Sequence, residues 1–287
     1  RQDEFDCGIM ITASHNPFYD NGIKVINKKG EKLDDETTAL IEAYIDGDLS
    51  ALGVEGKDLP LAHRERIGRI IDHVSGRNRY VGYLISVASN SYKNLRIGLD
   101  CANGASWMIA KAVFDALGAQ TVIIGAEPDG LNVNNGCGST HMEKLCELVK
   151  EHHLDCGFAF DGDADRCIAV DENGNVVDGD AMMYILANRL KSRGMLNSNT
   201  VVATVMSNSG FFASLKKIGI ECEQTKVGDR FVYEAMQNND FSLGGEQSGH
   251  IILKKYATTG DGILTAIMIA EEMCDRKSSL SKLVEPI

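Results

Sequence analysis

Three aspartates at alternate positions, Asp161, Asp163 and Asp165, place the strongest local constraint on this chain. Carboxylates so close together repel one another, and each one that is removed from water costs free energy. A hard divalent cation with oxygen ligands, such as Mg²⁺ or Ca²⁺, removes both costs. Short apolar runs at residues 157–160 and 167–170 flank the cluster and are typical of strands. The pattern therefore predicts a metal-binding turn between two strands.

An EF-hand calcium loop is the main alternative for this cluster. The three aspartates fit the first, third and fifth positions of such a loop, and Glu172 fits the twelfth. The sixth position, which needs glycine for a sharp turn, is however Arg166. The flanking strands also disagree, because an EF-hand loop joins two helices. We therefore predict a Mg²⁺ site with Arg166 directed toward a phosphate, and a solvated acidic turn is the alternative without a metal.

Composition excludes several classes of partner. The 287 residues suffice for roughly two or three domains, and the net charge of -12 argues against nucleic acid, whose phosphates attract basic surfaces. No apolar run reaches about 18 residues, so no membrane span is expected. The eight cysteines form no C-x-x-C pair, which disfavours zinc and favours a reducing cytoplasm.

A recurring order of helix, glycine and strand predicts the fold class. Residues 95–124 show this order after an initial strand, and residues 201–224 repeat it. Such alternation predicts an α/β protein made of tandem α/β domains with mixed, mainly parallel sheets. Functional side chains are then expected at the carboxyl ends of strands.

The expected domain boundaries come from a long helical pattern and from the spacing of the motifs. The pattern runs over residues 64–89, and Gly76 is expected to break it at a boundary. The predicted domains are residues 1–76, 77–179 and 180–287. The aspartate cluster then lies in the second domain.

A polar turn at residues 12–17 follows a run at residues 8–13 that is typical of a buried strand. This arrangement displays Ser14 at the carboxyl end of the strand. Its hydroxyl can act as a nucleophile or phosphate carrier if a base or metal activates it. A turn serine before a proline is the simpler structural alternative. Lys24 lies in the next expected strand, where an exposed lysine is the simplest interpretation.

A loop at residues 225–230 carries Lys226 and Arg230 between an expected strand and an expected helix. Backbone amides and cations at a helix N-terminus suit a phosphate or sugar hydroxyls. A loop in which Asp229 only caps the next helix is the alternative, and the two interpretations are compatible.

A second loop, at residues 244–250, begins with two glycines that allow a ligand to approach the backbone closely. Glu246 and Ser248 are suited to binding vicinal sugar hydroxyls. His250 opens the next apolar run and can equally be a strand residue.

Together these motifs resemble the α-D-phosphohexomutase superfamily, and most closely its phosphoglucosamine branch. The run Thr-Ala-Ser-His-Asn-Pro resembles the family's phosphoserine loop, which implies that Ser14 carries the phosphoryl group. The resemblance implies one Mg²⁺ per chain, held by the aspartate cluster and a phosphoserine oxygen of Ser14, with Arg166 beside it.

The loop Gly-Glu-Gln-Ser-Gly-His resembles the family's sugar-binding loop, and its Gln247 is typical of the phosphoglucosamine branch. Residues 18–24, 137–141 and 224–230 also resemble that branch. Family members have four domains, and this chain resembles part of the first, all of the second and most or all of the third. We therefore expect a fragment that turns over poorly by itself.

The resemblance implies an interconversion of glucosamine 6-phosphate and glucosamine 1-phosphate through a 1,6-bisphosphate, which serves UDP-N-acetylglucosamine and cell-wall precursor synthesis. Glucosamine 1,6-bisphosphate or a similar hexose bisphosphate is implied as activator. Lys24 is the candidate for stabilising phosphoryl oxygens or for proton transfer, and His15 and His250 are candidates for acid-base work. The implied substrate-binding residues are Lys226, Arg230, Glu246, Ser248 and His250.

Three other functions remain open. A phosphomannomutase/phosphoglucomutase differs only in the sugar it prefers, and a Mg²⁺-dependent phosphatase would pass the phosphoryl group to water. A non-catalytic phosphosugar-binding fragment would never carry phosphate on Ser14. The expected ligand in every case is a small phosphosugar, and the sequence leaves a homodimer open.

Overall fold

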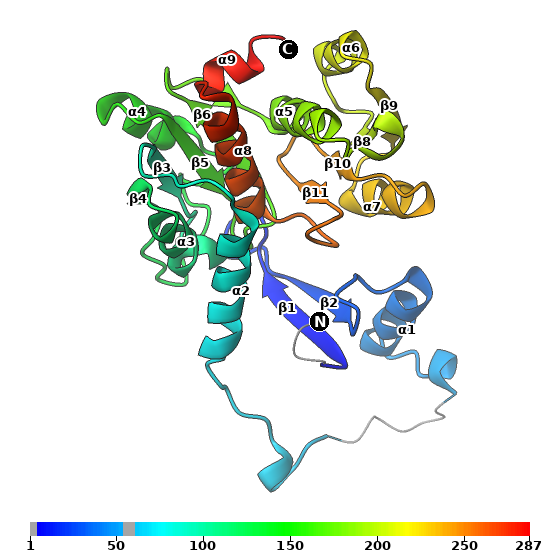
Figure 1. Cartoon of the computed structure of the whole chain (residues 1–287). Coiled ribbons are helices and arrows are strands. Elements are labelled where there is room, and N and C mark those ends of the chain that lie inside the picture. Colours follow the sequence, from blue (N-terminus) through cyan, green and yellow to red (C-terminus); the bar gives the residue numbers. More distant parts are fainter. Residues whose placement is uncertain (1–4, 54–60) are drawn as a thin grey trace. The chain divides into compact units, whose positions relative to one another are not determined.

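The computed structural model describes residues 5–53 and 61–287 (Figure 1). Its chain contacts divide it into two compact units. The larger unit consists of Thr12–Gly22 and Arg79–Ile287, and the rest of the described chain forms the smaller unit. The short segment 12–22 therefore packs with the larger unit, although the chain on both sides of it belongs to the smaller one.

The described part of the smaller unit contains a hairpin of strands and one α-helix, together with the residues that lead into the next α-helix. The strands β1 (Cys7–Thr12) and β2 (Gly22–Asn27) form a two-stranded sheet. Helix α1 (Asp35–Ile45) is capped by Asp34, whose carboxylate accepts a hydrogen bond from Thr37 N at 2.8 Å. A short 3-10 turn, η1 (Ser50–Leu52), follows.

The burial predicted for residues 8–13 is wrong. A strand forms there, but Ile9 and Ile11 are 67% and 74% exposed. Among the described residues, β1 pairs only with β2, and a two-stranded sheet has no second layer against which to bury a face.

The helical pattern predicted over residues 64–89, with a break at Gly76, is wrong in its first part and in the position of its break. The structure has a 3-10 turn, η2 (Arg64–Arg66), and then helix α2 (Val74–Val87). Gly76 lies inside this helix and does not break it. Ile70 is fully exposed, so its apolar side chain gains no burial that could stabilise a helix at this point of the chain.

The larger unit contains a first sheet with strand order β4-β3-β5-β6-β7. Strands β3, β4 and β5 are parallel, whereas β6 and β7 add antiparallel pairs at one edge. Apolar faces of the covering helices pack on these strands. The elements of this part are β3 (Arg96–Asp100), η3 (Ala105–Met108), α3 (Ala110–Ala116), β4 (Gln120–Ile124), α4 (Glu143–Glu151), β5 (Cys156–Phe160), β6 (Cys167–Asp171) and β7 (Val176–Val177).

A second sheet in the same unit has the order β11-β10-β8-β9. Its strands β8, β9 and β10 are parallel and β11 is antiparallel, so the predicted class of mixed, mainly parallel α/β domains is confirmed. The elements are α5 (Gly179–Ser192), η4 (Asn197–Asn199), β8 (Thr200–Thr204), α6 (Ser209–Lys217), β9 (Glu221–Thr225), α7 (Asp229–Asn238), β10 (Leu243–Gly245), β11 (Ile251–Leu253), α8 (Gly262–Arg276) and α9 (Leu280–Val284).

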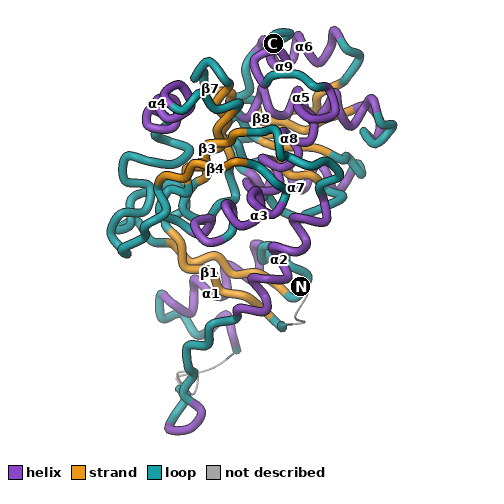
Figure 2. The backbone as a smooth tube through the Cα atoms, turned by 60° about the vertical axis from the view of Figure 1, so that its left-hand side comes forward, coloured by secondary structure: helices purple, strands orange, loops and turns teal. Residues whose placement is uncertain are grey.

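The two sheets of the larger unit share one hydrophobic core. Phe158 of β5, Leu243 of β10 and Ile267 of α8 belong to a single cluster of buried side chains. Helices α5 and α8 contact each other and are buried along most of their length, and Figure 2 shows both helices beside the strands. This shared core fixes the loops of the two sheets relative to one another. Among the described residues, no helix is long and apolar enough to cross a membrane.

A buried charge network ties α5 to α8. The guanidinium of Arg189 lies 2.7 Å from a carboxylate oxygen of Glu272 and 3.6 Å from one of Glu271, and all three side chains are at most 6% exposed. Glu271 also accepts hydrogen bonds from Ser89 and from the Asn90 amide, in the segment that follows α2. The network therefore connects three parts of the larger unit.

We expect Arg189→Ala to lower the free energy of unfolding of the larger unit by about 3–5 kcal/mol, because it removes the buried cation beside Glu271 and leaves Glu272 paired only with the half-exposed Arg276. Arg193→Ala is the matched control: Arg193 also pairs with Asp275, but its side chain is 44% exposed, so its loss should cost less than about 1 kcal/mol. Urea unfolding followed by circular dichroism measures both. Equal losses of unfolding free energy for the two variants would contradict a stabilising role for the buried Arg189 guanidinium.

Candidate functional site

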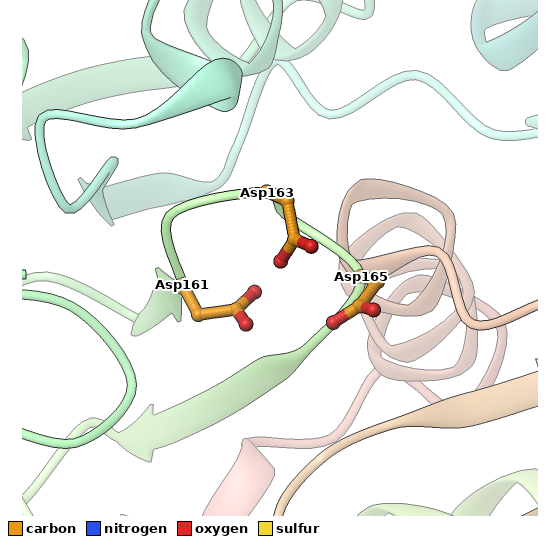
Figure 3. A group of neighbouring side chains, drawn as sticks. All are labelled: Asp161, Asp163 and Asp165. Atoms are coloured by element: carbon orange, nitrogen blue, oxygen red, sulfur yellow. The ribbon is translucent and has the colours of Figure 1, made fainter. Parts of the chain in front are cut away.

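The aspartate turn follows the carboxyl end of β5. Asp161, Asp163 and Asp165 each offer a carboxylate oxygen, and these atoms lie within 4.8 Å of one another. Figure 3 shows the three side chains turned toward a common space. Ala164 adopts a left-handed backbone (φ 60°), and its N–H donates to the Asp161 carbonyl at 3.1 Å, which closes the turn. The predicted convergence of the three carboxylates is observed.

Electrostatics at this turn favour a cation. Asp161 is fully buried, and its Oδ1 accepts a hydrogen bond from Arg166 N at 3.1 Å. Its buried Oδ2 has no hydrogen-bond partner among the described residues. Burial, and then the charges of Asp165 and Asp163, raise the pKa of Asp161 to about 8. A divalent metal with oxygen ligands would satisfy the Oδ2 atom and neutralise the cluster, so these residues can hold such an ion.

Ser14 lies on a loop that docks on the same turn. Gly162, between the first two aspartates, donates its N–H to the Ser14 carbonyl at 3.0 Å. A Cβ at Gly162 would lie 2.5 Å from that oxygen, so this approach requires glycine. Ser14 itself is half-buried and has a left-handed backbone (φ 51°). The structure therefore brings the predicted serine loop and the predicted metal loop together within one unit.

The loop after β10 meets the metal turn from the second sheet. Cys167 donates its N–H to the Gly249 carbonyl at 3.1 Å, and Arg166 and His250 form an isolated antiparallel bridge. Gly249 has φ 90°, and a Cβ there would overlap the Cys167 carbonyl. Backbone pairing thus joins the predicted sugar loop to the strand that carries the metal turn.

Glu246 and its neighbours are held by contacts with other loops. Glu246 Oε1 accepts a hydrogen bond from Gly228 N at 3.0 Å, and Ser248 Oγ lies 3.5 Å from the other carboxylate oxygen. Gln247 donates from Nε2 to Asp178 Oδ2 at 3.1 Å. Asp178 caps helix α5, so the Gln247 side chain fixes the loop on that helix.

His250 lies between two carboxylates. It is 3% exposed, and its Nε2 lies 3.8 Å from Asp165 Oδ2 and 3.7 Å from Asp229 Oδ2. The imidazole therefore connects a residue of the metal turn with the loop at residues 225–230. This position suits a positioning role, and the predicted acid-base role stays a prediction.

The predicted cationic residues lie in different settings. Arg230 pairs with Glu234 at 2.7 Å on the exposed face of α7, and Lys226 Nζ lies 5.9 Å from the centroid of the Phe231 ring. The Nε of Arg166 is buried and has no hydrogen-bond partner in the part of the chain that the structure describes. Lys24 belongs to the smaller unit.

Two residues that organise the site were not predicted from the sequence. Asn134 holds the serine loop through its side-chain amide, and Asp229 faces His250. Asp229 appeared in the sequence only as a helix cap. The one signal for Asn134 was its place in a segment rich in asparagine and glycine, which is typical of any turn.

Comparison with known proteins gives consistent matches along the chain. Models of the phosphoglucomutase/phosphomannomutase alpha/beta/alpha domains I, II and III match residues 1–51, 78–174 and 178–287. A phosphoglucosamine mutase of Lachnospira eligens is 56% identical over 287 residues, which cover 100% of this chain and 62% of that protein. The chain thus spans about three fifths of the length of this relative.

Solved structures show the same fold. A phosphoglucomutase/phosphomannomutase family protein of Burkholderia thailandensis superposes with a TM-score of 0.78 at 25% identity, over 98% of this chain and 58% of that one. An Aspergillus fumigatus N-acetylphosphoglucosamine mutase, solved in complex with GlcNAc-6P and magnesium, gives a TM-score of 0.69 at 16% identity. That alignment covers 98% of this chain and 72% of the fungal chain, and at this identity it supports the fold alone.

We expect Asp161→Asn to stabilise the metal-free protein, because it removes a buried carboxylate that two neighbouring carboxylates repel. The same change should abolish stabilisation by Mg²⁺, which for the unaltered protein reaches about 2.7 kcal/mol at 100 times its dissociation constant. Thermal unfolding with and without Mg²⁺ measures both effects. Asp115→Asn, at an exposed aspartate that pairs with Lys111, is the control. Equal Mg²⁺ stabilisation of all variants would contradict a metal site at this turn.

Proposed function

The chain belongs to the phosphoglucomutase/phosphomannomutase family, and from this premise we propose that it is the serine- and metal-carrying part of a phosphoglucosamine mutase. The reaction interconverts glucosamine 6-phosphate and glucosamine 1-phosphate. The observation that carries the proposal is the docking of the Ser14 loop on the aspartate turn, because this joins a hydroxyl carrier and a metal-binding cluster.

Phosphorylated Ser14 starts the reaction. A hydroxyl oxygen of the sugar phosphate attacks the phosphorus, the bond to Ser14 Oγ breaks, and the sugar's proton passes to a base. The product of this step is a 1,6-bisphosphate. After the bisphosphate reorients, Ser14 Oγ attacks its other phosphorus, and the leaving sugar oxygen takes up a proton. The serine thereby regains its phosphate, and glucosamine 1,6-bisphosphate or a similar hexose bisphosphate can act as activator.

Three aspartates suit the role of ligands to a single Mg²⁺, together with an oxygen of the phosphorylated Ser14. The bound ion supplies neutralisation of charge on the transferring phosphoryl group. The hydrogen bond from Ala164 N to the Asp161 carbonyl closes the turn and helps to keep the three carboxylates near one another.

Local cations have to hold the anionic substrate, since the whole chain carries a net charge of -12. We assign this task to Arg166, Lys226 and Arg230. Lys24 is proposed for stabilising phosphoryl oxygens or moving a proton, and His15 is proposed as a second acid-base group.

Glu246 and Ser248 are the proposed partners of the sugar hydroxyls. The Gly228 amide and the Ser248 hydroxyl orient the Glu246 carboxylate, so little side-chain entropy remains to be lost when a sugar binds. His250 is proposed to support both this loop and the metal turn.

We propose glucosamine as the sugar because of the similarity to the phosphoglucosamine mutase of Lachnospira eligens, and not because of Gln247. Because the Gln247 amide donates to Asp178, this residue distinguishes the branch without itself facing the ligand. A phosphomannomutase/phosphoglucomutase is therefore the second candidate. The domain boundaries near residues 76 and 179 stay part of the proposal and are supported by domain models that match residues 78–174 and 178–287.

The proposed location is a reducing cytoplasm. All eight cysteines lie within the described residues, and each remains a thiol in the structure. Burial raises the pKa of the Cys101 thiol to about 12, so this cysteine behaves as an inert core side chain.

We expect the full-length protein that contains this chain to convert glucosamine 6-phosphate to glucosamine 1-phosphate with Mg²⁺, as phosphorus NMR would show. Ser14→Ala should abolish both this conversion and labelling of the protein by a radiolabelled hexose 1,6-bisphosphate, because the acceptor oxygen is gone. Ser86→Ala, at an exposed serine of α2, should leave both unchanged. Inorganic phosphate without the 1-phosphate product would indicate a phosphatase instead, and a labelled Ser14→Ala protein would refute the assigned carrier.

A further inference from the structure

Asn134 makes the side-chain contacts that hold the serine loop. It is 6% exposed and lies on the segment between β4 and α4. Its Nδ2 atom lies 2.8 Å from the Ser14 carbonyl oxygen and 2.8 Å from the Asn16 carbonyl oxygen. These partners are 120 and 118 residues away along the chain, so the amide joins two distant loops.

The backbone of Ser14 needs such support. Its φ of 51° is uncommon for a residue with a side chain, and such a conformation persists only where the surrounding structure enforces it. Its carbonyl accepts hydrogen bonds from both Asn134 Nδ2 and Gly162 N. Two donors from two loops therefore fix the peptide group that follows Ser14.

A buried carboxylate, that of Asp100, supports Asn134 indirectly through the backbone of Ala102. The backbone N–H of Asn134 donates to the Ala102 carbonyl at 2.9 Å. The Ala102 N–H donates to Asp100 Oδ1 at 3.0 Å, and the Gly138 N–H donates to Asp100 Oδ2 at 2.8 Å. Asp100 is fully buried at the end of β3. The support for the serine loop thus extends through a fixed chain of hydrogen bonds to the sheet.

The two hydrogen bonds from Asn134 Nδ2 require an amide side chain at this position. Two carbonyl oxygens converge on one nitrogen, so the side chain must present two N–H donors at the same atom. A serine offers only one donor, and an aspartate of the same shape offers none when ionised and would repel both carbonyls.

We propose that Asn134 is a positioning residue for phosphoryl transfer, which keeps the Ser14 backbone left-handed and docked on the aspartate turn. The role in transfer rests on the proposed mutase function, whereas the docking itself does not. Without the amide, segment 12–22 keeps the Gly162 contact but loses both side-chain contacts from Asn134. The serine then samples positions away from the metal turn, and the transfer slows.

The test compares Asn134→Asp with Asn135→Asp in the full-length protein. Both changes replace an amide by a carboxylate in the same loop, but Asn135 is exposed, and its backbone N–H donates to the Asn132 carbonyl within its own loop. Hydrogen exchange is measured at residues 12–22 and at the Gly162 amide, together with kcat and KM for glucosamine 6-phosphate.

We expect Asn134→Asp to speed exchange at residues 12–22 and at Gly162, to lower kcat by about 10- to 100-fold, and to leave KM within about twofold. Exchange in β8 serves as the reference for global stability and should not change. Asn135→Asp should match the unaltered protein in every measurement.

The outcomes separate the two proposals. Unchanged exchange at residues 12–22 in Asn134→Asp would overturn the positioning role, whatever the activity. Faster exchange there with unchanged kcat would overturn the role in transfer. If the unaltered protein has no mutase activity while Asn134→Asp still loosens residues 12–22, the mutase proposal fails and the docking role of Asn134 stands.

Discussion

Holding three carboxylates together at one turn is the constraint on which the rest of the larger unit depends. Asp161 is buried beside two further acids, and the backbone must keep them together against their repulsion. The shared core of both sheets supplies that rigidity, because strands and helices from each sheet contribute to it. Helix α8 also reaches the turn directly, because Gly262 at its start donates its N–H to the Ala164 carbonyl at 2.9 Å.

Short-range chemistry made the successful predictions possible. The aspartate turn and its flanking strands are encoded within a few residues, and the repulsion between neighbouring acids does not depend on the fold around them. The order of helix, glycine and strand is equally local. Gly118 and Gly219 both adopt positive φ where a helix ends, a conformation that glycine adopts at little cost. The class of fold and the aspartate part of the site were therefore predictable.

The failed and missed predictions all concern long-range partners. The apolar residues of β1 predicted burial, but burial requires a second layer that the sequence pattern cannot specify. Periodicity over residues 64–89 predicted a helical pattern from residue 64 onward, although Ile70 is fully exposed in the structure. Asn134 is of a residue type that is common in any turn, and Gln247 is an ordinary polar loop residue. Their roles arise from carbonyl and carboxylate partners far away in the chain.

The attachment of residues 12–22 to the larger unit has a consequence for biosynthesis. Ser14 leaves the ribosome 120 residues before Asn134, its side-chain partner, and the aspartate turn follows later still. At about 5–20 residues per second, the nascent serine loop waits for seconds without its docking surface. The reactive serine therefore acquires its conformation late, when the second half of the site has been made. A chain whose translation stops before these segments carries Ser14 but lacks the contacts from Asn134 and Gly162 that fix its conformation.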